Sequence, residues 1–264
     1  MRINNNITAL NSHRQYTINN SGIGKNVEKL SSGFRVNRAG DDAAGLAISE
    51  KMRTQIRGLN MASKNSQDGI SLVQTAEGAM QTAHNIMQRM RELAVQSRNG
   101  TNDNTVDRNA LDLEFQQLKD EITQIESSIK FNDMTVFGVT VFTLQTGANS
   151  LDTTTFGVSG LTTPSGAITD EASAAAAISA MTSAINELSV TRAELGAIQN
   201  RLEFKIQNLD NSAENLAAAE SRIRDVDMAK MMTEFTKNNI LFQASTAMLA
   251  QANAIPQGVL QLLG

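Results

Sequence analysis

The 264-residue sequence contains no cysteine and no tryptophan, one tyrosine and two prolines, and aromatic residues make up only 4% of it. Without cysteine, disulfides, thiolate metal sites and cysteine nucleophiles are excluded. With so few aromatic residues, alanine, leucine, isoleucine and methionine must supply the buried surface, which favours close helix–helix packing over a thick mixed core. The composition therefore indicates a mainly α-helical protein.

The sequence also has no excess of basic residues and few side chains of the kinds that catalysis uses. The net charge of −4 at pH 7 provides no electrostatic basis for binding nucleic acid. Only His13 and His84 offer an imidazole, and neither belongs to a His-Glu-x-x-His motif. No calcium loop or glycine-rich phosphate loop is present either. We expect no enzymatic activity, no cofactor and no metal site. Residues 1–11 lack the apolar segment of a cleavable signal peptide.

The strongest periodic signal runs from Ile178 to Ile223. Large apolar residues recur there every seven positions: Met181, Leu188, Leu195, Leu202, Leu209, Leu216 and Ile223. A companion row three residues earlier is mixed, with Ile178 and Ile185 followed by Arg192. This a/d pattern predicts one helix of roughly 70 Å, at about 1.5 Å per residue. Such a helix requires partner helices along its apolar seam.

Two further segments supply matching seams. Residues 43–97 are helical in pattern, and they carry one apolar row through Val73, Met80 and Met87 and a second through Leu72 and Leu93, so this helix must touch more than one partner. The next helix, with Asn104 or Thr105 as its cap, has an unbroken apolar series: Leu111, Phe115, Leu118, Ile122, Ile125 and Ile129. The short loop between these two segments predicts an antiparallel helical-bundle rod.

Residues 131–169 change character. Valine and phenylalanine alternate there with threonine and glycine, which predicts short strands or hairpins, interpreted here as an exposed knob. O-linked sugars on its threonines and serines are a hypothesis suggested by this composition. Thr169, Asp170 and Glu171 are expected to cap the return into the long helix.

The two ends of the chain have helical patterns without a core of their own. The N-terminal segment carries Ile3, Ile7 and Leu10, and the C-terminal segment carries Met228, Phe235, Phe242, Leu249 and Ile255. No charged residue occurs from Asn238 to Gly264, but polar residues interrupt this stretch too often for a membrane span. We expect the two ends to pair, to become ordered when neighbouring subunits bury them, and so to build an open helical polymer.

Four stretches resemble the signatures of bacterial flagellins. They are residues 30–53 (LSSGFRVNRAGDDAAGLAISEKMR), 88–97 (QRMRELAVQS), 221–229 (SRIRDVDMA) and 249–257 (LAQANAIPQ). The resemblance covers nearly the whole chain except residues 135–170, which implies a minimal form without large outer domains. A hook–filament junction protein and a monomeric coiled-coil scaffold are the alternatives. The second would have ordered ends without forming a polymer.

The resemblance implies export in an unfolded state through the flagellar type III apparatus and polymerisation beneath a cap into the extracellular motility filament. It implies an inner core of residues 1–42 and 222–264, outer-core helices at 43–130 and 173–221, and a variable region at 131–172. Expected partners are other copies of the chain, an export chaperone, the filament cap and the hook-junction proteins.

The resemblance also suggests recognition of the monomer by Toll-like receptor 5. The family's receptor-contacting residues match Arg89, Leu93 and Glu114 of this sequence. The competing interpretation is that these residues form contacts between protofilaments, because the same surface serves both purposes.

Overall fold

The computed structural model describes residues 6–103, 106–138, 141–164 and 166–263, and for residues 256–263 it describes the backbone alone. The elements follow one another in this order: α1 (Ile7–Ser32), α2 (Ala43–Ser97), α3 (Asp107–Ser128), β1 (Lys130–Phe131), β2 (Met134–Thr135), β3 (Val141–Gln145), β4 (Thr153–Gly157), α4 (Glu171–Arg224) and α5 (Met228–Leu263). By internal contacts the chain divides into two units. The terminal unit comprises residues up to Thr54 and from Asn215 onward, and the rod unit comprises Gln55–Glu214.

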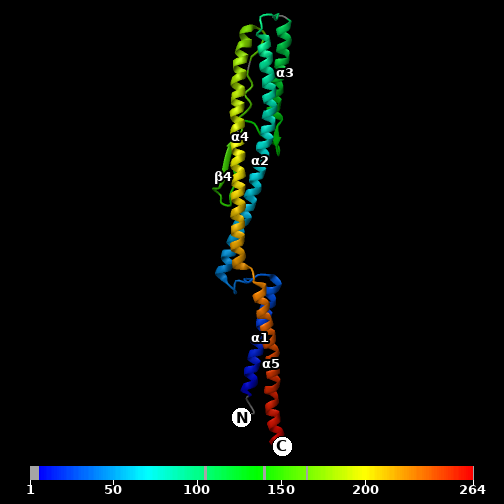
Figure 1. The fold of residues 1–264 in the computed structure, drawn as a ribbon, viewed down its shortest axis with the longest axis vertical. Coiled ribbons are helices and arrows are strands. Elements are labelled where there is room, and N and C mark those ends of the chain that lie inside the picture. The colour runs from blue at the N-terminus through cyan, green and yellow to red at the C-terminus, as the bar shows by residue number, and fades with distance from the viewer. Residues whose placement is uncertain (1–5, 104–105, 139–140, 165, 264) are drawn as a thin grey trace. The chain divides into compact units, whose positions relative to one another are not determined.

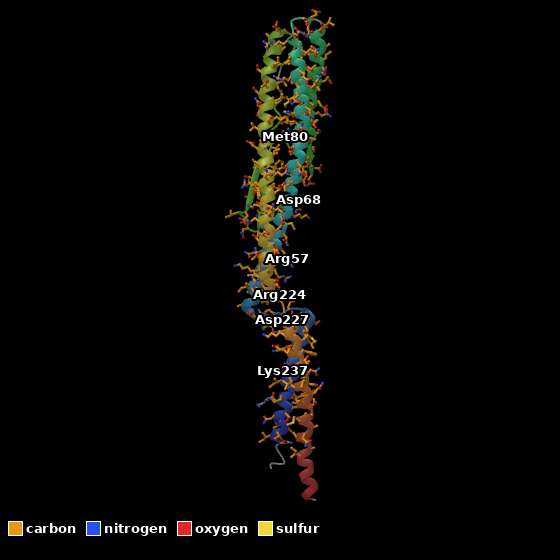
Figure 2. All side chains as sticks on the ribbon, in the orientation of Figure 1. Arg57, Asp68, Met80, Arg224, Asp227 and Lys237 are labelled. Carbon is orange, nitrogen blue, oxygen red and sulfur yellow. The ribbon has the colours of Figure 1, made fainter. Side chains whose placement is uncertain are left out.

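The rod unit is an antiparallel bundle of α2, α3 and α4 (Figure 1). The register of α2 against α4 is visible in the Arg192–Glu77 ion pair at 3.5 Å. One continuous apolar core joins the three helices, and Met80, labelled in Figure 2, is fully buried in it. The predicted fold class is therefore confirmed: a mainly α, antiparallel helical-bundle rod with small hairpins and paired terminal helices.

The long apolar row of α4 lies in this core where the helix belongs to the rod unit. Met181, Leu188, Leu195, Leu202 and Leu209 are each at most 5% exposed. Leu216 and Ile223, which belong to the terminal unit, are half-buried. On α3, the core receives Phe115, Ile122 and Ile125, with Leu111 and Leu118 half-buried against it. Ile129 packs there too, but it follows the helix as an extended C-cap residue.

The second buried row of α4 differs from the one that the sequence suggested. Ala177, Ala184 and Thr191 are buried, whereas Ile178 and Ile185 are only half-buried. Small side chains bring the helix axes closer together, so the row next to the partner is the small one, and the larger isoleucines cover its edge.

The strands form two separate antiparallel hairpins, β1–β2 and β3–β4. Asn132 and Asp133, both at positive φ, make the tight turn of the first, as a two-residue hairpin loop requires. The second lies on α2 at two glycines. A Cβ at Gly58 would stand 3.0 Å from the Cβ of Ala148, and a Cβ on Gly69 would overlap the side chain of Leu144. These glycines in the middle of a helix therefore make room for the hairpin.

The interpretation of residues 131–169 as an exposed knob is wrong. Phe142 and Phe156 are buried, and after β4 the chain returns along the helices with Val158, Leu161 and Ile168 in the core. The backbone N–H of Ile168 donates to the Asp112 carboxylate at 2.8 Å. The apolar residues of this segment complete the bundle core, because its three helices leave part of their apolar surface uncovered.

In the described residues, side-chain caps mark the starts of α1, α2, α4 and α5. Asn6 accepts from the N–H of Ala9 at the start of α1, and Gly33 ends that helix at φ 73°. Asp42 caps α2 through the N–H of Gly45. At the start of α4, hydrogen bonds from Ser173 hold the pKa of the Asp170 carboxyl below its usual value. The caps expected at Asn104 or Thr105 lie outside the described residues.

Candidate assembly interface

In the terminal unit, α1 and α5 pair side by side in antiparallel orientation (Figure 1). The side-chain amide of Asn6 donates to the carbonyl of Ala252 at 2.7 Å, and Asn19 donates to the hydroxyl of Ser245 at 2.9 Å. The rings of Tyr16 and Phe242 stack with centroids 4.9 Å apart. The two ends of the chain thus meet as the sequence predicted.

The surface by which α1 meets α5 combines small and polar residues of α1 with large apolar residues of α5, among them Met231, Phe235, Phe242 and Leu249. The less exposed residues of α1 recur at helical spacing as Ala9, Ser12, Tyr16, Asn19, Ile23 and Asn26. Asn26 is 8% exposed, and its side-chain amide nitrogen has no hydrogen-bond partner. A buried amide without a partner costs free energy, and small side chains bury little apolar area. The small and polar residues of α1 therefore limit the apolar area that its pairing with α5 buries.

Many large apolar residues of this pair face outward. On α1, Ile7, Leu10 and Ile18 are 59%, 66% and 56% exposed. On α5, the exposed set is Met228, Met232, Ile240, Leu241, Met248 and Ile255, between 41% and 62% exposed. The outward side of a solvated helix pair is normally polar, with the apolar side chains between the helices. The outward side of α1 and α5, defined by these residues, is called the terminal apolar surface below.

The residues expected to take part in assembly fall into two groups. Ile7, Leu10, Met228 and Ile255 belong to the terminal apolar surface. Phe235, Phe242 and Leu249 are half-buried on the side of α5 that faces α1. Ile3 lies outside the described residues. The sequence analysis did not assign Ile18 or Ile240 to assembly, and Ile240 falls outside the seven-residue series that the pairing side of α5 follows.

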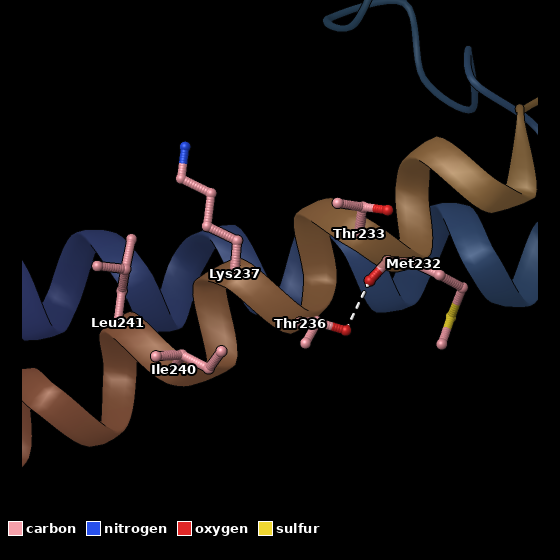
Figure 3. A pocket seen from close by; sticks show the side chains of 6 residues that line it. All are labelled: Met232, Thr233, Thr236, Lys237, Ile240 and Leu241. Atoms are coloured by element: carbon pink, nitrogen blue, oxygen red, sulfur yellow. Dashed lines mark hydrogen bonds between the residues drawn. The ribbon is translucent and has the colours of Figure 1, made fainter.

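An open groove lies on α5 within the terminal apolar surface (Figure 3). It is lined by Met232, Thr233, Thr236, Lys237, Ile240 and Leu241. The Thr236 hydroxyl donates to the Met232 carbonyl at 2.8 Å, so this polar group already has its partner inside the helix. Lys237 is the only charged residue among the lining residues. The groove therefore offers mostly methyl and methylene groups to an incoming side chain.

Arg224 joins the segments at the other end of the helix pair. Its guanidinium lies 4.7 Å from the centroid of the Phe34 ring and forms a 2.6 Å ion pair with Glu50, and this hydrogen bond lowers the pKa of the Glu50 carboxyl. The backbone of Phe34 bridges to Asp225, and the N–H of Val226 donates to the carbonyl of Gly33 at 3.0 Å. Local periodicity does not predict this joint, although its residues lie in the signature stretches 30–53 and 221–229.

The three residues matched to a receptor-contacting set do not form one exposed surface. The Arg89 and Glu114 side chains are 50% and 45% exposed and form an ion pair at 2.9 Å that links α2 to α3. Leu93 is 0% exposed in the core shared by α2, α3 and α4. The bundle covers the row of α2 to which Leu93 belongs, so its side chain is not part of the exposed surface of the folded chain.

The described residues contain no helix with the length and hydropathy needed to cross a bilayer. In the same part of the chain, no cluster of three or more histidine, aspartate or glutamate side chains is arranged to hold a metal ion. Among the described side chains, the feature that points to a binding surface is the exposure of large apolar groups on α1 and α5.

Two family models match the chain. The model of the bacterial flagellin N-terminal helical region matches residues 3–140, and that of the C-terminal helical region matches residues 178–263. The crystal structure of Bacillus cereus flagellin is similar at a TM-score of 0.52 and 35% identity, covering 60% of this chain and 94% of that one. These matches span the helices of both units and agree with the fold.

Curated relatives agree with these matches along the full length of the chain. The chain is 59% identical to the flagellin of Halalkalibacterium halodurans over 272 aligned residues and 50% identical to the flagellin of Bacillus subtilis over 303, with 100% of both chains covered in each case. It is also 46% identical to the flagellar filament 33 kDa core protein of Treponema phagedenis over 287 residues. The chain therefore belongs to the bacterial flagellin family.

Proposed function

We propose that this chain, a structural subunit of the bacterial flagellar filament, polymerises through the terminal apolar surface of α1 and α5. The observation that carries the proposal is the number of large apolar side chains that this helix pair leaves exposed on its outward side, in addition to those, such as Phe235, Phe242 and Leu249, that lie between the helices. Burying the remaining exposed half of one such side chain would contribute about 1 kcal/mol. A neighbouring copy that covers the surface gains this contribution many times over.

The proposed inner and outer cores of the filament correspond roughly to the terminal unit and the rod unit. Residues 1–42 and 222–264 would form the inner core of the filament, and the helices within 43–130 and 173–221 would form the outer core around it. The region 131–172 supports the outer core, because its apolar residues pack into the bundle. In this arrangement no part of the chain has a catalytic role.

Export in an unfolded state is part of the same proposal. The absence of cysteine removes the risk of cross-linking during passage. An export chaperone that shields the terminal apolar surface, a cap that directs its insertion and hook-junction proteins that receive the first subunits are the expected partners. The filament itself is extracellular.

Recognition of the monomer by Toll-like receptor 5 is proposed for the exposed Arg89–Glu114 pair on α2 and α3. Two charged groups that are half exposed and held together present a defined polar feature to a partner. Because Leu93 is buried, the proposal rests on this pair and its exposed neighbours.

The test of the polymer function compares the intact chain with a chain that lacks residues 238–264. Both are seeded with sheared filament ends, then pelleted and viewed by negative-stain electron microscopy. We expect filaments from the intact chain only, with the shortened chain remaining a helical monomer. If the intact chain stays soluble and the amides of α1 and α5 are already protected from hydrogen exchange, the chain is a monomeric scaffold and the proposal fails.

A point substitution tests whether the terminal apolar surface itself is required for polymerisation. Ile240→Asp places a charge on a side chain that is 61% exposed, so the monomer should fold normally while polymerisation is lost. Glu234→Gln is the matched control, because it changes an exposed charge on the same helix and leaves every apolar side chain in place. If both variants polymerise equally well, the terminal apolar surface is not required for polymerisation.

A further inference from the structure

The methionines of this protein differ widely in exposure. The sequence contains twelve methionines and no cysteine, so every sulfur atom belongs to a thioether. On α5, Met228, Met232 and Met248 are 50%, 48% and 62% exposed, and as members of the terminal apolar surface they are called the outer methionines. Four others lie in the core of the rod unit at no more than 1% exposure and are called the core methionines: Met80, Met87, Met90 and Met181.

Two adjacent residues of α5 show this contrast within one turn of helix. Met231 is 9% exposed on the side that meets α1, whereas Met232 is 48% exposed and lines the open groove on α5 (Figure 3). Successive residues of an α-helix are rotated by about 100°, so the pairing with α1 covers one sulfur and leaves the next one open. The two residues share the same helix and the same neighbours in sequence, so access to the sulfur is what separates them.

Exposure of the sulfur decides how readily a methionine is oxidised. With hydrogen peroxide, the sulfur lone pair attacks one peroxide oxygen, the O–O bond breaks, and an S–O bond forms. The hydroxide that leaves takes the remaining proton and becomes water. Sulfur loses two electrons and the peroxide gains them, so no further reactant is needed. Because the chain has no cysteine, the thioethers are the sulfur groups on which a peroxide acts.

The groove beside Met232 offers no free hydroxyl group to a sulfoxide. Among its described lining residues, Thr233 and Thr236 already donate their hydroxyl hydrogens to backbone carbonyls of α5, at 2.9 and 2.8 Å. The Lys237 side chain extends from α5 in a different direction from that of Met232 (Figure 3). Water therefore satisfies the S=O oxygen of an oxidised Met232, and covering that oxygen with an apolar surface is unfavourable.

We propose that the outer methionines are an oxidation site of the free subunit, at which peroxides convert the thioethers to sulfoxides and thereby prevent polymerisation. The inference rests on the proposed polymer function, because it assigns the modification to the surface that another copy covers. In the free subunit these side chains are about half exposed, as Met228 and Met232 show. In the polymer a neighbouring copy covers them, so oxidation acts before assembly. The core methionines stay reduced and keep the rod unit folded.

Peptide mapping of the peroxide-treated monomer tests the selectivity. Trypsin cleaves after Lys230 and Lys237, so Met231 and Met232 share one peptide, and fragment ions show which of them carries the oxygen. We expect the outer methionines to be oxidised about tenfold faster or more than Met231 and the core methionines, because a covered sulfur reacts only after local opening. Equal rates at Met231 and Met232 would overturn the inference.

The same mapping on assembled filaments tests the protection that a neighbouring copy provides. We expect oxidation of the outer methionines to be slower than in the monomer by about tenfold or more, since their sulfurs are covered. Equal rates in filaments and monomer would show that these sulfurs stay accessible after assembly, and the inference would fail.

The critical concentration for polymerisation onto sheared filament ends, measured before and after peroxide treatment, tests the consequence. For the unmodified chain it should rise by about tenfold or more, because each sulfoxide must lose its hydration when the surface is covered. The outer variant, Met228→Leu/Met232→Leu/Met248→Leu, removes the outer sulfurs and keeps apolar side chains of similar volume. The control variant, Met61→Leu/Met134→Leu, removes two exposed sulfurs of the rod unit. Compared with its own untreated sample, the control variant should respond to peroxide as the unmodified chain does, and the outer variant should not respond.

Two further measurements exclude damage to the fold as the cause. The treated monomer should keep its circular dichroism and melting temperature, and a loss of either would show that oxidation in the core stops assembly. Methionine sulfoxide reductases, one for each sulfoxide epimer, should restore the original critical concentration of the oxidised chain. Absence of this recovery, or an outer variant that remains sensitive to peroxide, overturns the inference while the polymer function stands. Absence of filaments from the untreated, unmodified chain overturns the polymer function instead.

Discussion

The two glycines at positions 69 and 78 of α2 allow one substitution to be tested in two environments. Both lie in the interior of the same helix, so replacing either by alanine should gain about 0.5–1 kcal/mol from the reduced conformational freedom of the unfolded chain. At Gly78 nothing lies within 4 Å of the new methyl group. Gly78→Ala should therefore stabilise the rod unit by nearly that full amount, which raises its melting temperature by roughly 2–4 °C.

At Gly69 the same methyl group overlaps a δ-methyl of Leu144 on β3 and stands 3.4 Å from one of Leu202. The Leu144 side chain must rotate away from α2, and overpacking of this kind costs about 1–3 kcal/mol. The gain in helix propensity offsets part of that cost. We expect Gly69→Ala to be less stable than Gly78→Ala by about 1–3 kcal/mol, the overpacking cost alone.

The assay is unfolding of the monomer in guanidinium chloride, followed by circular dichroism at concentrations too low for polymerisation. A third variant, Leu144→Ala, completes a double-mutant cycle with Gly69→Ala. In its background Gly69→Ala should become stabilising, because the clashing methyl group has been removed. If Gly69→Ala and Gly78→Ala stabilise the intact chain equally, β3 does not lie on α2 at Gly69 and the account of the hairpin is wrong.

Three further predictions concern other parts of the chain. Leu209→Asp should destabilise the rod unit by about 4 kcal/mol or more, because Leu209 is 5% exposed and an unpaired charge would enter the core; unchanged helicity and melting temperature would contradict its place in the seam. Asp170 has a lowered pKa, so its stabilising effect is fully present above its usual pKa of 3.8 and is lost as the pH falls through the lowered value. The difference in melting temperature between the unmodified chain and Asp170→Asn should therefore shrink with acidification. A difference that stays constant would refute the role of Asp170 as a helix cap. Arg224→Lys should remove the contact with the Phe34 ring and speed hydrogen exchange at the amides of Arg35 and Val226 by about fivefold, as loss of roughly 1 kcal/mol implies; unchanged exchange would show that the ring contact does not hold the joint.

Much of the fold could be predicted because its signals are local. The seven-residue spacing of Leu188, Leu195 and Leu202 reports a helix and its buried side together, since both follow from 3.6 residues per turn. Asp42 and Asp170 mark helix starts because a short carboxylate reaches the free N–H groups of the first turn. The signature stretches revealed the family, which the full-length relatives confirm.

Other features depend on which segment covers which surface, and local periodicity carries no such information. The apolar row through Leu72 and Leu93 predicted that Leu93 faces a partner helix, and the bundle covers it, although the match to a receptor-contacting set had suggested an accessible residue. Residues 158–168 looked like an exposed excursion, because nothing in their own pattern shows that the helices leave apolar surface for them to fill. Only the packed structure decides this, since burial is a property of two surfaces in contact.

The terminal helices show most clearly which features follow from the local sequence and which follow from tertiary packing. Their sequence determined that they are helical, that they have no core of their own and that they pair. The tertiary structure decided that Asn19 and Asn26 face the partner helix while Leu10 and Ile240 face outward. The seven-residue series of α5 does lie partly between the helices, at Phe235, Phe242 and Leu249. Local periodicity does not show that Leu10 and Ile240 remain exposed, because exposure depends on which surfaces the paired helices cover.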